Sequence, residues 1–347
     1  MASNNGEAYR PWGISALHFP GHDAPAAERL RFLVGYAVLA PSGYNRQPWY
    51  FRIRAGVLEV FADRTRALAV VDHDDREMTI SCGAAVFNLR VAARHFGYEP
   101  RVTLVPDGAK PDLLATVELG ERKPPVHEDN LLFSAIPNRR TNRRPFEPRK
   151  VEPQILERLC AAAMREGAWM VALTKREERH ALAELIARAD RLQFSDKRFR
   201  RELAAWVHSS RSHSHDGMPA YAQGVREIMT AAHSLGLRAL DLGKGVATGD
   251  LDLAEHSPLL AVLGTAEDDP AHWLRCGQAL QHALLLACAD GIWASFMNQP
   301  VEVETMRPHV SSLVKRSGYP QVIVRMGYGP EPPLMPRRGV AEVVRSG

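Results

Sequence analysis

Two stretches of about twenty residues carry apolar side chains around most of a helix surface, and they constrain the fold more than any other part of the chain. They run from about residue 77 to 96 and from 271 to 289. A helix with so broad an apolar face has to be buried, because a surface helix keeps a polar face toward water. Each stretch has a Cys-Gly pair near its start, at 82–83 and at 276–277, which leaves an internal duplication and a chance match as alternatives.

Short strands are expected around each apolar helix. Their sequence patterns predict strands over residues 50–54, 57–61, 101–105 and 113–119 in the first half, and over 169–173, 259–264, 292–297 and 321–325 in the second. Further helices are expected over 30–39, 130–135, 153–165 and 302–316, with long helical stretches up to about residue 238. This order of helices and strands agrees with an α+β fold.

The chain is long enough for two domains. It has 347 residues, of which 45% are hydrophobic, so it can bury a large core. Lys123-Pro124-Pro125 is the predicted linker, because paired prolines interrupt regular structure. We expect a polar leader over residues 1–25, a first half over 26–124 and a second half over 125–347.

Cysteine spacing and hydropathy exclude several classes of protein. The four cysteines are far apart and form no CxxC pair, so zinc ribbons, redox motifs and disulfide frameworks have no support. The start of the chain lacks the basic and apolar regions of a signal peptide, and the most apolar run, 279–297, is interrupted by polar residues. We expect a soluble, cytoplasmic protein without a membrane segment. The net charge of +4 favours anionic ligands in general.

A polar segment lies between a predicted helix and a predicted strand. It reads Pro41-Ser42-Gly43-Tyr44-Asn45-Arg46-Gln47-Pro48-Trp49, and we call it the corner. Its prolines restrict the backbone, while its hydroxyl, carboxamide and backbone groups offer hydrogen bonds at the edge of a strand, where binding residues are often carried. The corner therefore predicts a rigid binding element.

An arginine-rich loop begins the second half, with the sequence Asn138-Arg139-Arg140-Thr141-Asn142-Arg143-Arg144-Pro145-Phe146. Arginine binds phosphate in a bidentate manner, so a phosphate site is one interpretation, and a solvated basic loop is the other. The short polar pair at 141–142 and the closing Pro-Phe favour the phosphate site. Aromatic residues do not alternate with the arginines, which argues against nucleic-acid binding.

Three further segments have simpler interpretations. His213 and His215 lack a third ligand at a defined spacing, so we expect no metal site. The glycines of residues 242–249 match no phosphate-binding fingerprint and predict a loop. The carboxylates of residues 72–77 lie beside a histidine, as in a general acid/base group, but they also lead into a helix, whose start is stabilised by negative charge, and this second interpretation is favoured.

The corner, the loop and two later segments together resemble the nitroreductase family of FMN proteins, and more closely its duplicated, Acg-type branch. The resemblance covers residues 26–347, and its segments are Ala40 to Trp49, Arg139-Arg140-Thr141-Asn142-Arg143, Trp293-Ala294-Ser295-Phe296-Met297-Asn298-Gln299-Pro300 and Pro336-Arg337-Arg338. It implies two tandem nitroreductase-like domains of the α+β class. Each would have a mixed, mostly antiparallel sheet flanked by helices, and the two would form an intramolecular pseudo-dimer.

The resemblance also implies FMN as the cofactor and NAD(P)H as the electron donor, although the sequence has no separate dinucleotide fingerprint. The implied FMN ligands are Arg139, Arg140, Thr141, Arg337 and Arg338 at the phosphate and ribityl oxygens, Arg143 by the N1/O2 edge, Ser42, Gly43, Asn45 and Gln47 against the ring from the other half, and Ser295 and Asn298 near the central ring. Arg143 would stabilise the reduced, anionic flavin.

Each of the two main motifs occurs once. The corner is in the first half and the arginine-rich loop is in the second, whereas a symmetric dimer of the family would have both in each subunit. The sequence therefore predicts one FMN per chain, at the interface of the two halves. Because the halves pair internally, the chain could be a monomer.

The leading hypothesis is an FMN-dependent oxidoreductase that passes hydride from NAD(P)H to a small-molecule acceptor, either nitroaromatic or quinone-like. No side chain is required as an acid or a base. The alternative is an FMN-sequestering protein with little turnover, in which residues of about 206–249 form a lid over the flavin. That region contains a polar segment rich in helix-breaking residues, which is typical of a mobile loop.

Overall fold

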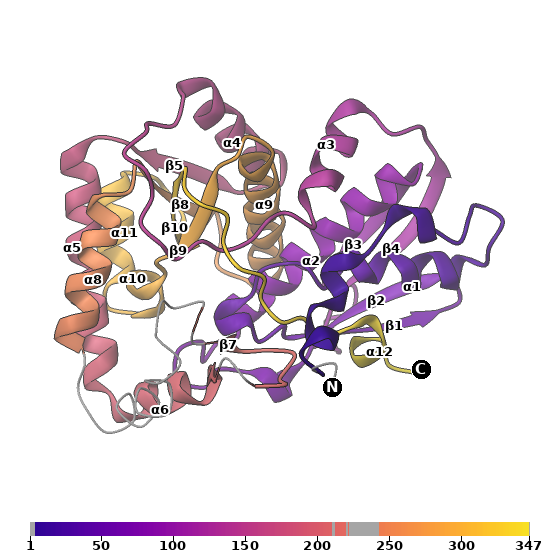
Figure 1. Ribbon diagram of the computed structural model, residues 1–347, viewed down its shortest axis with the longest axis horizontal. Helices are drawn as coiled ribbons and strands as arrows, with labels where there is room; N and C mark the ends of the chain where they lie inside the picture. The colour runs from indigo at the N-terminus through magenta and orange to yellow at the C-terminus, as the bar shows by residue number, and fades with distance from the viewer. Residues whose placement is uncertain (1–3, 210–211, 220, 222–242, 347) are drawn as a thin grey trace.

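The computed structural model describes residues 4–209, 212–219, 221 and 243–346, and it contains two four-stranded sheets (Figure 1). The first sheet has the order β1 (Trp49–Arg54), β2 (Val57–Ala62), β4 (Leu113–Arg122) and β3 (Tyr98–Leu104). The second has the order β5 (Trp169–Leu173), β8 (Leu259–Thr265), β10 (Tyr319–Gly327) and β9 (Trp293–Phe296). Neighbouring strands in both sheets are antiparallel.

Both halves follow the same succession of elements. A helix precedes the first strand, a long helix separates the second strand from the third, and the strands lie in the order first, second, fourth, third. These helices are α1 (Ala26–Ala37) and α2 (Arg76–His95) in the first half, and α4 (Pro153–Arg165) and α9 (Pro270–Ala289) in the second. The predicted α+β architecture with one sheet per half is confirmed, and the shared order supports the internal duplication.

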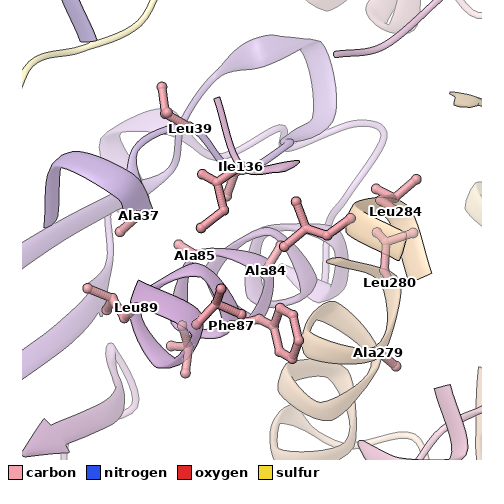
Figure 2. Close-up of a cluster of buried hydrophobic side chains, with 14 of the residues drawn as sticks. Ala37, Leu39, Ala84, Ala85, Phe87, Leu89, Ile136, Ala279, Leu280 and Leu284 are labelled. Atoms are coloured by element: carbon pink, nitrogen blue, oxygen red, sulfur yellow. The ribbon is translucent and has the colours of Figure 1, made fainter. Parts of the chain in front are cut away.

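The two long apolar helices, α2 and α9, pack against each other at the centre of the molecule. Figure 2 shows part of this core, with Ala84 and Phe87 on α2 and Ala279 and Leu280 on α9. The helices approach closely at the Cys-Gly pairs, where a Cβ on Gly83 would overlap the backbone of Leu274. A Cβ on Gly277 would likewise overlap the backbone of α2. The two glycines are therefore required by the crossing itself.

The second half is larger because segments are inserted between its strands. Between β5 and β8 lie α5 (Arg176–Ser195), α6 (Lys197–Trp206), the two-residue strands β6 (Val207–His208) and β7 (Met218–Pro219), and α8 (Gly243–Glu255). Between β9 and β10 lie α10 (Gln299–Glu302) and α11 (Arg307–Val314). The helices α5, α8 and α11 lie on the opposite side of the second sheet from α9 (Figure 1).

Two segments cross between the halves. The C-terminal segment runs from β10 to the first sheet, where Val344 forms a parallel bridge with Phe51 beyond the short helix α12 (Val340–Val343) (Figure 1). The connection after β4 carries α3 (His127–Ala135) and then brings Thr141 into a parallel bridge with Ala294 of β9. These crossings bring the corner, the arginine-rich loop and the tail together.

The predicted elements agree with the structure except in two places. The helix expected over 302–316 is divided into α10 and α11, because Pro308 lacks an N–H and is tolerated only in the first turn of a helix. The glycines of 242–249 lie largely in α8 rather than in a loop, because this helix packs on α5 and buries Ala247 and Ala254. The helical stretch expected up to residue 238 falls partly outside the described residues.

Candidate functional site

A cavity of about 520 Å³ lies between the two halves. The first half contributes the corner and α2, and the second contributes the arginine-rich loop, α5, α8, α10, β9 and β10. The apolar side chains in its walls include Leu68, Val71, Ile80, Phe194, Phe199, Leu203, Met218, Val246, Leu253, Leu280, Phe296, Met297 and Val322. Apolar walls with a few converging polar groups are typical of a cofactor or small-molecule site.

The corner has an unusual backbone. The angle φ is 50° at Tyr44, 56° at Asn45 and 50° at Gln47, all in the left-handed region that non-glycine residues rarely adopt. Ser42 Oγ accepts a hydrogen bond from the backbone N–H of Gln47 at 2.9 Å and so stabilises this conformation. Ser42, Gly43 and Tyr44 line the cavity. Strained backbone of this kind is often found at functional sites.

Asn45 and Gln47 do not line the cavity, and instead they connect the corner to two other segments. Asn45 Nδ2 donates to the carbonyl oxygens of Gly217 and Pro336, each at 3.0 Å. Gln47 Nε2 donates to the carbonyl oxygen of His215 at 2.8 Å. The corner is thereby joined to the C-terminal tail and to the segment 212–219, which belongs to the predicted lid.

The C-terminal arginine pair also binds the corner. Arg337 donates to Asn45 Oδ1, and the Arg338 guanidinium donates to the carbonyl oxygens of Gln47 at 3.0 Å and Trp49 at 3.3 Å. Neither arginine lines the cavity. Both side chains therefore hold the corner in place without lining the cavity.

Four arginines place positive charge at the cavity wall and in the layer of residues behind that wall. We call them the arginine cluster, and they are Arg139, Arg143, Arg325 and Arg337. Burial lowers the pKa of all four, to about 10 for Arg139 and Arg325 and to about 9 for Arg337. The charges of Arg139 and Arg143 lower the pKa of Arg337 further. Arg143 and Arg325 line the cavity directly.

Within the described residues, hydrogen-bond acceptors and negative charges balance the arginine cluster only in part. Arg139 Nε, Arg337 Nε and both Nε and Nη1 of Arg325 are buried without a hydrogen-bond partner. Arg143 Nη2 donates a weak hydrogen bond to the sulfur of Met218 at 3.7 Å. Buried cations without counter-charge are costly. A phosphate group would supply both negative charge and acceptor oxygens, so the donor set fits the predicted FMN.

Four carboxyl groups also line the cavity, namely Glu77, Asp190, Asp250 and Glu302, which we call the acidic group. Burial raises the pKa of each of them. For Asp190 the pKa rises to about 8, and the neighbouring charge of Asp250 adds to the effect of burial. The negative charge of Glu77 raises the pKa of Glu302 in the same way. The cavity thus contains both cationic and protonatable anionic groups.

Carboxamides hold the acidic group in place. Asn298 Nδ2 donates to Glu77 Oε1 at 2.8 Å, and Gln193 Nε2 donates to Glu302 Oε2 at 2.6 Å. Asn298 Oδ1 in turn accepts from the backbone N–H of Ile323 at 2.9 Å. Asn298 is therefore locked between α2 and β10.

The structure separates the predicted site residues into two sets. Those that line the cavity are Ser42, Gly43, Thr141, Arg143, Ser295 and Asn298, and those that do not line it are Asn45, Gln47, Arg139, Arg140, Arg337 and Arg338. In the second set, Arg140 forms an ion pair with Glu331 and lies 6.0 Å from the ring of Trp12. Contact of either set with a cofactor stays a prediction.

Sequence reasoning missed the acidic group and Arg325. Asp190 had a recognisable signal, because it continues the spacing of Leu182 and Ile186 along the buried face of α5, where an unpaired charge is out of place. The sequence favours a helix-start role for the carboxylates of residues 72–77 over a general acid/base role. Asp72 fulfils that role, since its carboxylate accepts from the backbone N–H groups of residues 77 and 78, each at 2.8 Å.

The remaining candidates give no further site. His215 Nδ1 lies 2.8 Å from Glu342 Oε2, and within the described ranges no group of His, Cys, Asp and Glu has the arrangement of a metal site. Among the helices of the described part of the chain, none has both the length and the hydropathy needed to cross a bilayer.

Comparison with known proteins identifies relatives along nearly the whole chain. No family model matches it. It is 32% identical over 326 residues to "Putative NAD(P)H nitroreductase Rv3131" of Mycobacterium tuberculosis, with 92% of each chain covered. It is 29% identical to "Putative NAD(P)H nitroreductase acg" of the same organism, with 90% of this chain and 94% of the relative covered.

More distant similarity extends to another organism and to solved structures. "Probable NAD(P)H nitroreductase PigM" of Serratia sp. is 24% identical, with 86% of this chain and 88% of the relative covered. Among solved structures, the FMN and NADPH-dependent nitroreductase NfnB of Sphigopyxis sp. is 18% identical with a TM-score of 0.42, covering 62% of this chain and 97% of that one.

Proposed function

Because the chain belongs to the nitroreductase family, we propose that it is an oxidoreductase that binds one FMN between its two halves and takes electrons from NAD(P)H. The observation that carries the proposal is the arginine cluster, in which four buried nitrogens, on Arg139, Arg325 and Arg337, lack hydrogen-bond partners, while Arg143 and Arg325 line a cavity of about 520 Å³. Bound FMN would supply the hydride chemistry, which no amino-acid side chain provides.

The residues proposed to hold FMN come from both halves. Arg143, Arg325 and Thr141 line the cavity, and Arg139 and Arg337 lie behind them, so the cofactor phosphate would be bound on this side. Ser42 and Gly43 of the corner would contact the flavin from the first half. A guanidinium close to the flavin favours its reduced, anionic form, and Arg143 is the residue to which we assign that role.

One FMN per chain follows from the asymmetry of the halves. The corner belongs to the first half and the arginine-rich loop to the second, and both line the same cavity of about 520 Å³. We therefore propose the division into residues 26–124 and 125–347, with the halves pairing internally and a monomer sufficient for activity. The apolar walls suit nitroaromatic or quinone-like acceptors.

A second candidate function is FMN sequestration. The insertion between β5 and β8 supplies Phe194, Phe199, Leu203, Met218 and Val246 to the cavity wall. Part of this insertion is also hydrogen-bonded to the corner. A cover of this kind favours retention of the flavin over exchange of substrates, so the same residues would serve a binding protein with little turnover.

One experiment separates the two candidates. The purified chain is saturated with FMN, the bound flavin is counted per chain, and NADPH is added without oxygen. Bleaching of the flavin absorbance supports the oxidoreductase, and a yellow protein that NADPH does not reduce supports sequestration. A chain that takes up no FMN refutes both, and two flavins per chain would refute the single site.

A further inference from the structure

Two acceptor oxygens in the cavity wall have no hydrogen-bond donor in the part of the chain that the structure describes. Asp190 is 1% exposed, and although its carboxyl is hydrogen-bonded to Gln299 and Asp250, its Oδ2 has no donor. Gln299 Oε1 is also without a partner, because its amide group is oriented by a 2.8 Å hydrogen bond from Nε2 to Asp250 Oδ2. Both side chains line the cavity. Buried acceptors without donors are uncommon in folded proteins.

The charged groups around these oxygens are mainly negative. Asp250 of α8 faces Asp190 of α5, and Arg325 of β10 and Arg191 of α5 act on this pair without an ion pair to either within the described residues. Glu77 and Glu302 line the same cavity, and Arg76 lies 3.7 Å from Glu77. Four carboxyl groups thus share one cavity with little counter-charge on their side of it.

A cation complements this wall in both hydrogen bonding and charge. A protonated amine has three N–H donors and no acceptor, which complements Asp190 Oδ2 and Gln299 Oε1, and its charge favours ionised carboxylates. The adjoining walls are apolar and aromatic, with Phe194, Phe199 and Leu203 beside α5. They would contact the hydrocarbon part of such a molecule.

We propose that the acidic group is a subsite for an organic cation, in which Asp190 and Gln299 bind the protonated amine of an acceptor whose apolar body lies against the apolar walls beside α5. The proposal rests on the proposed function in that the bound molecule would take electrons from the flavin. It narrows the acceptor class from aromatic compounds in general to those that carry a positive charge.

Binding of the cation should be coupled to release of protons. The carboxyl of Asp190, whose pKa is raised to about 8, is protonated at neutral pH in the free protein and is ionised by a bound cation. Affinity for an amine therefore increases as the pH rises from about 6.5 toward 8, whereas affinity for a neutral analogue stays constant.

The test compares two nitroaromatic probes that differ by one charge, 4-nitrobenzylamine and 4-nitrobenzyl alcohol. Binding to the FMN-loaded chain is measured by calorimetry at pH 7.5 in two buffers of different ionisation enthalpy, which reports protons released. We expect at least tenfold tighter binding of the amine, with proton release. Asp190→Asn should abolish that preference and leave the alcohol unaffected.

Two variants control for folding and surface charge. Asp250→Asn should reduce the preference as well, whereas Asp252→Asn, on the same helix with its side chain 72% exposed, should retain it. Equal affinity for the two probes overturns the proposal, and so does an amine preference that survives in Asp190→Asn. Flavin absorbance recorded on each sample shows separately whether FMN is bound, so failure of the subsite and failure of the FMN proposal are distinct results.

Discussion

The contact between α2 and α9 makes a quantitative prediction about stability. A Cβ on Gly83 would lie 3.0 Å from both the Cα and the carbonyl carbon of Leu274, and one on Gly277 would lie 2.9 Å from the Cα of Gly83. Carbon atoms in contact prefer about 3.5–4.0 Å. Because the obstructing atoms are backbone, Gly83→Ala forces the two helices apart by roughly 0.5–1 Å.

The expected cost is at the upper end of the range for overpacked cores, about 3 kcal/mol. Moving α2 and α9 apart affects one continuous core that includes residues of both halves. The chain should therefore unfold in a single transition, and the midpoint of that transition should fall to a lower urea concentration. With a urea m-value of about 3 kcal/mol/M, the midpoint falls by about 1 M. The assay is urea unfolding followed by circular dichroism, with stability taken from linear extrapolation.

Gly245→Ala provides the matched control. Gly245 lies in α8, and an added Cβ would have nothing within 4 Å. Alanine in an exposed helix is favoured over glycine by about 0.5–1 kcal/mol, so this variant should be slightly stabilised. If Gly83→Ala and Gly277→Ala unfold at the same urea concentration as the unmodified chain, then the close crossing of the central helices is wrong.

Three further predictions address the site. Arg143→Ala should weaken FMN binding about 10- to 100-fold in equilibrium dialysis, because a charge-assisted hydrogen bond contributes about 1.5–3 kcal/mol. Alanine at the exposed neighbour Arg144 should change FMN affinity little. If Arg143→Ala binds FMN as tightly as the unmodified chain, Arg143 is not part of the site. Asp190→Asn should gain stability relative to the unmodified chain as the pH rises from about 5 to 8. The native state keeps a proton on Asp190 up to about pH 8 whereas the unfolded chain loses it near pH 4, so ionisation opposes folding in that window; a constant difference in urea midpoint across it would contradict this. Gln47→Ala should accelerate hydrogen exchange in the 212–219 peptide, measured by mass spectrometry, because the 2.8 Å bond to the His215 carbonyl is lost; unchanged exchange would show that this bond does not hold the segment.

Local patterns predicted much of the fold. The helix over 153–165 and the strand over 169–173 have the bounds expected of them, since their apolar periodicity, proline at the helix start and following glycine are all local signals. The division of α10 from α11 and the helical glycines of α8 depend on one proline and on packing against α5. A single sequence gives only a weak signal for either feature.

Only part of the site could be predicted from the sequence, for a similar reason. The corner and the arginine-rich loop are contiguous motifs, so their chemistry can be recognised without knowing the fold. The acidic group comes from α2, α5, α8 and α10, and no sequence spacing relates these four carboxyls. Arg325 lies within a buried strand and resembles a core residue until its unpaired nitrogens are seen beside the cavity.

The sequence alone determined that two apolar helices must be buried, and it predicted two halves and a phosphate site in the loop at 138–146, because each of these follows from side chains close together in the chain. Only the tertiary structure decided which residues face the cavity. Arg337 and Arg338 are turned toward the corner, while Asp190 and Asp250 meet across two helices. Burial and charge depend on neighbours brought together from distant segments, and these neighbours are not encoded in any local pattern.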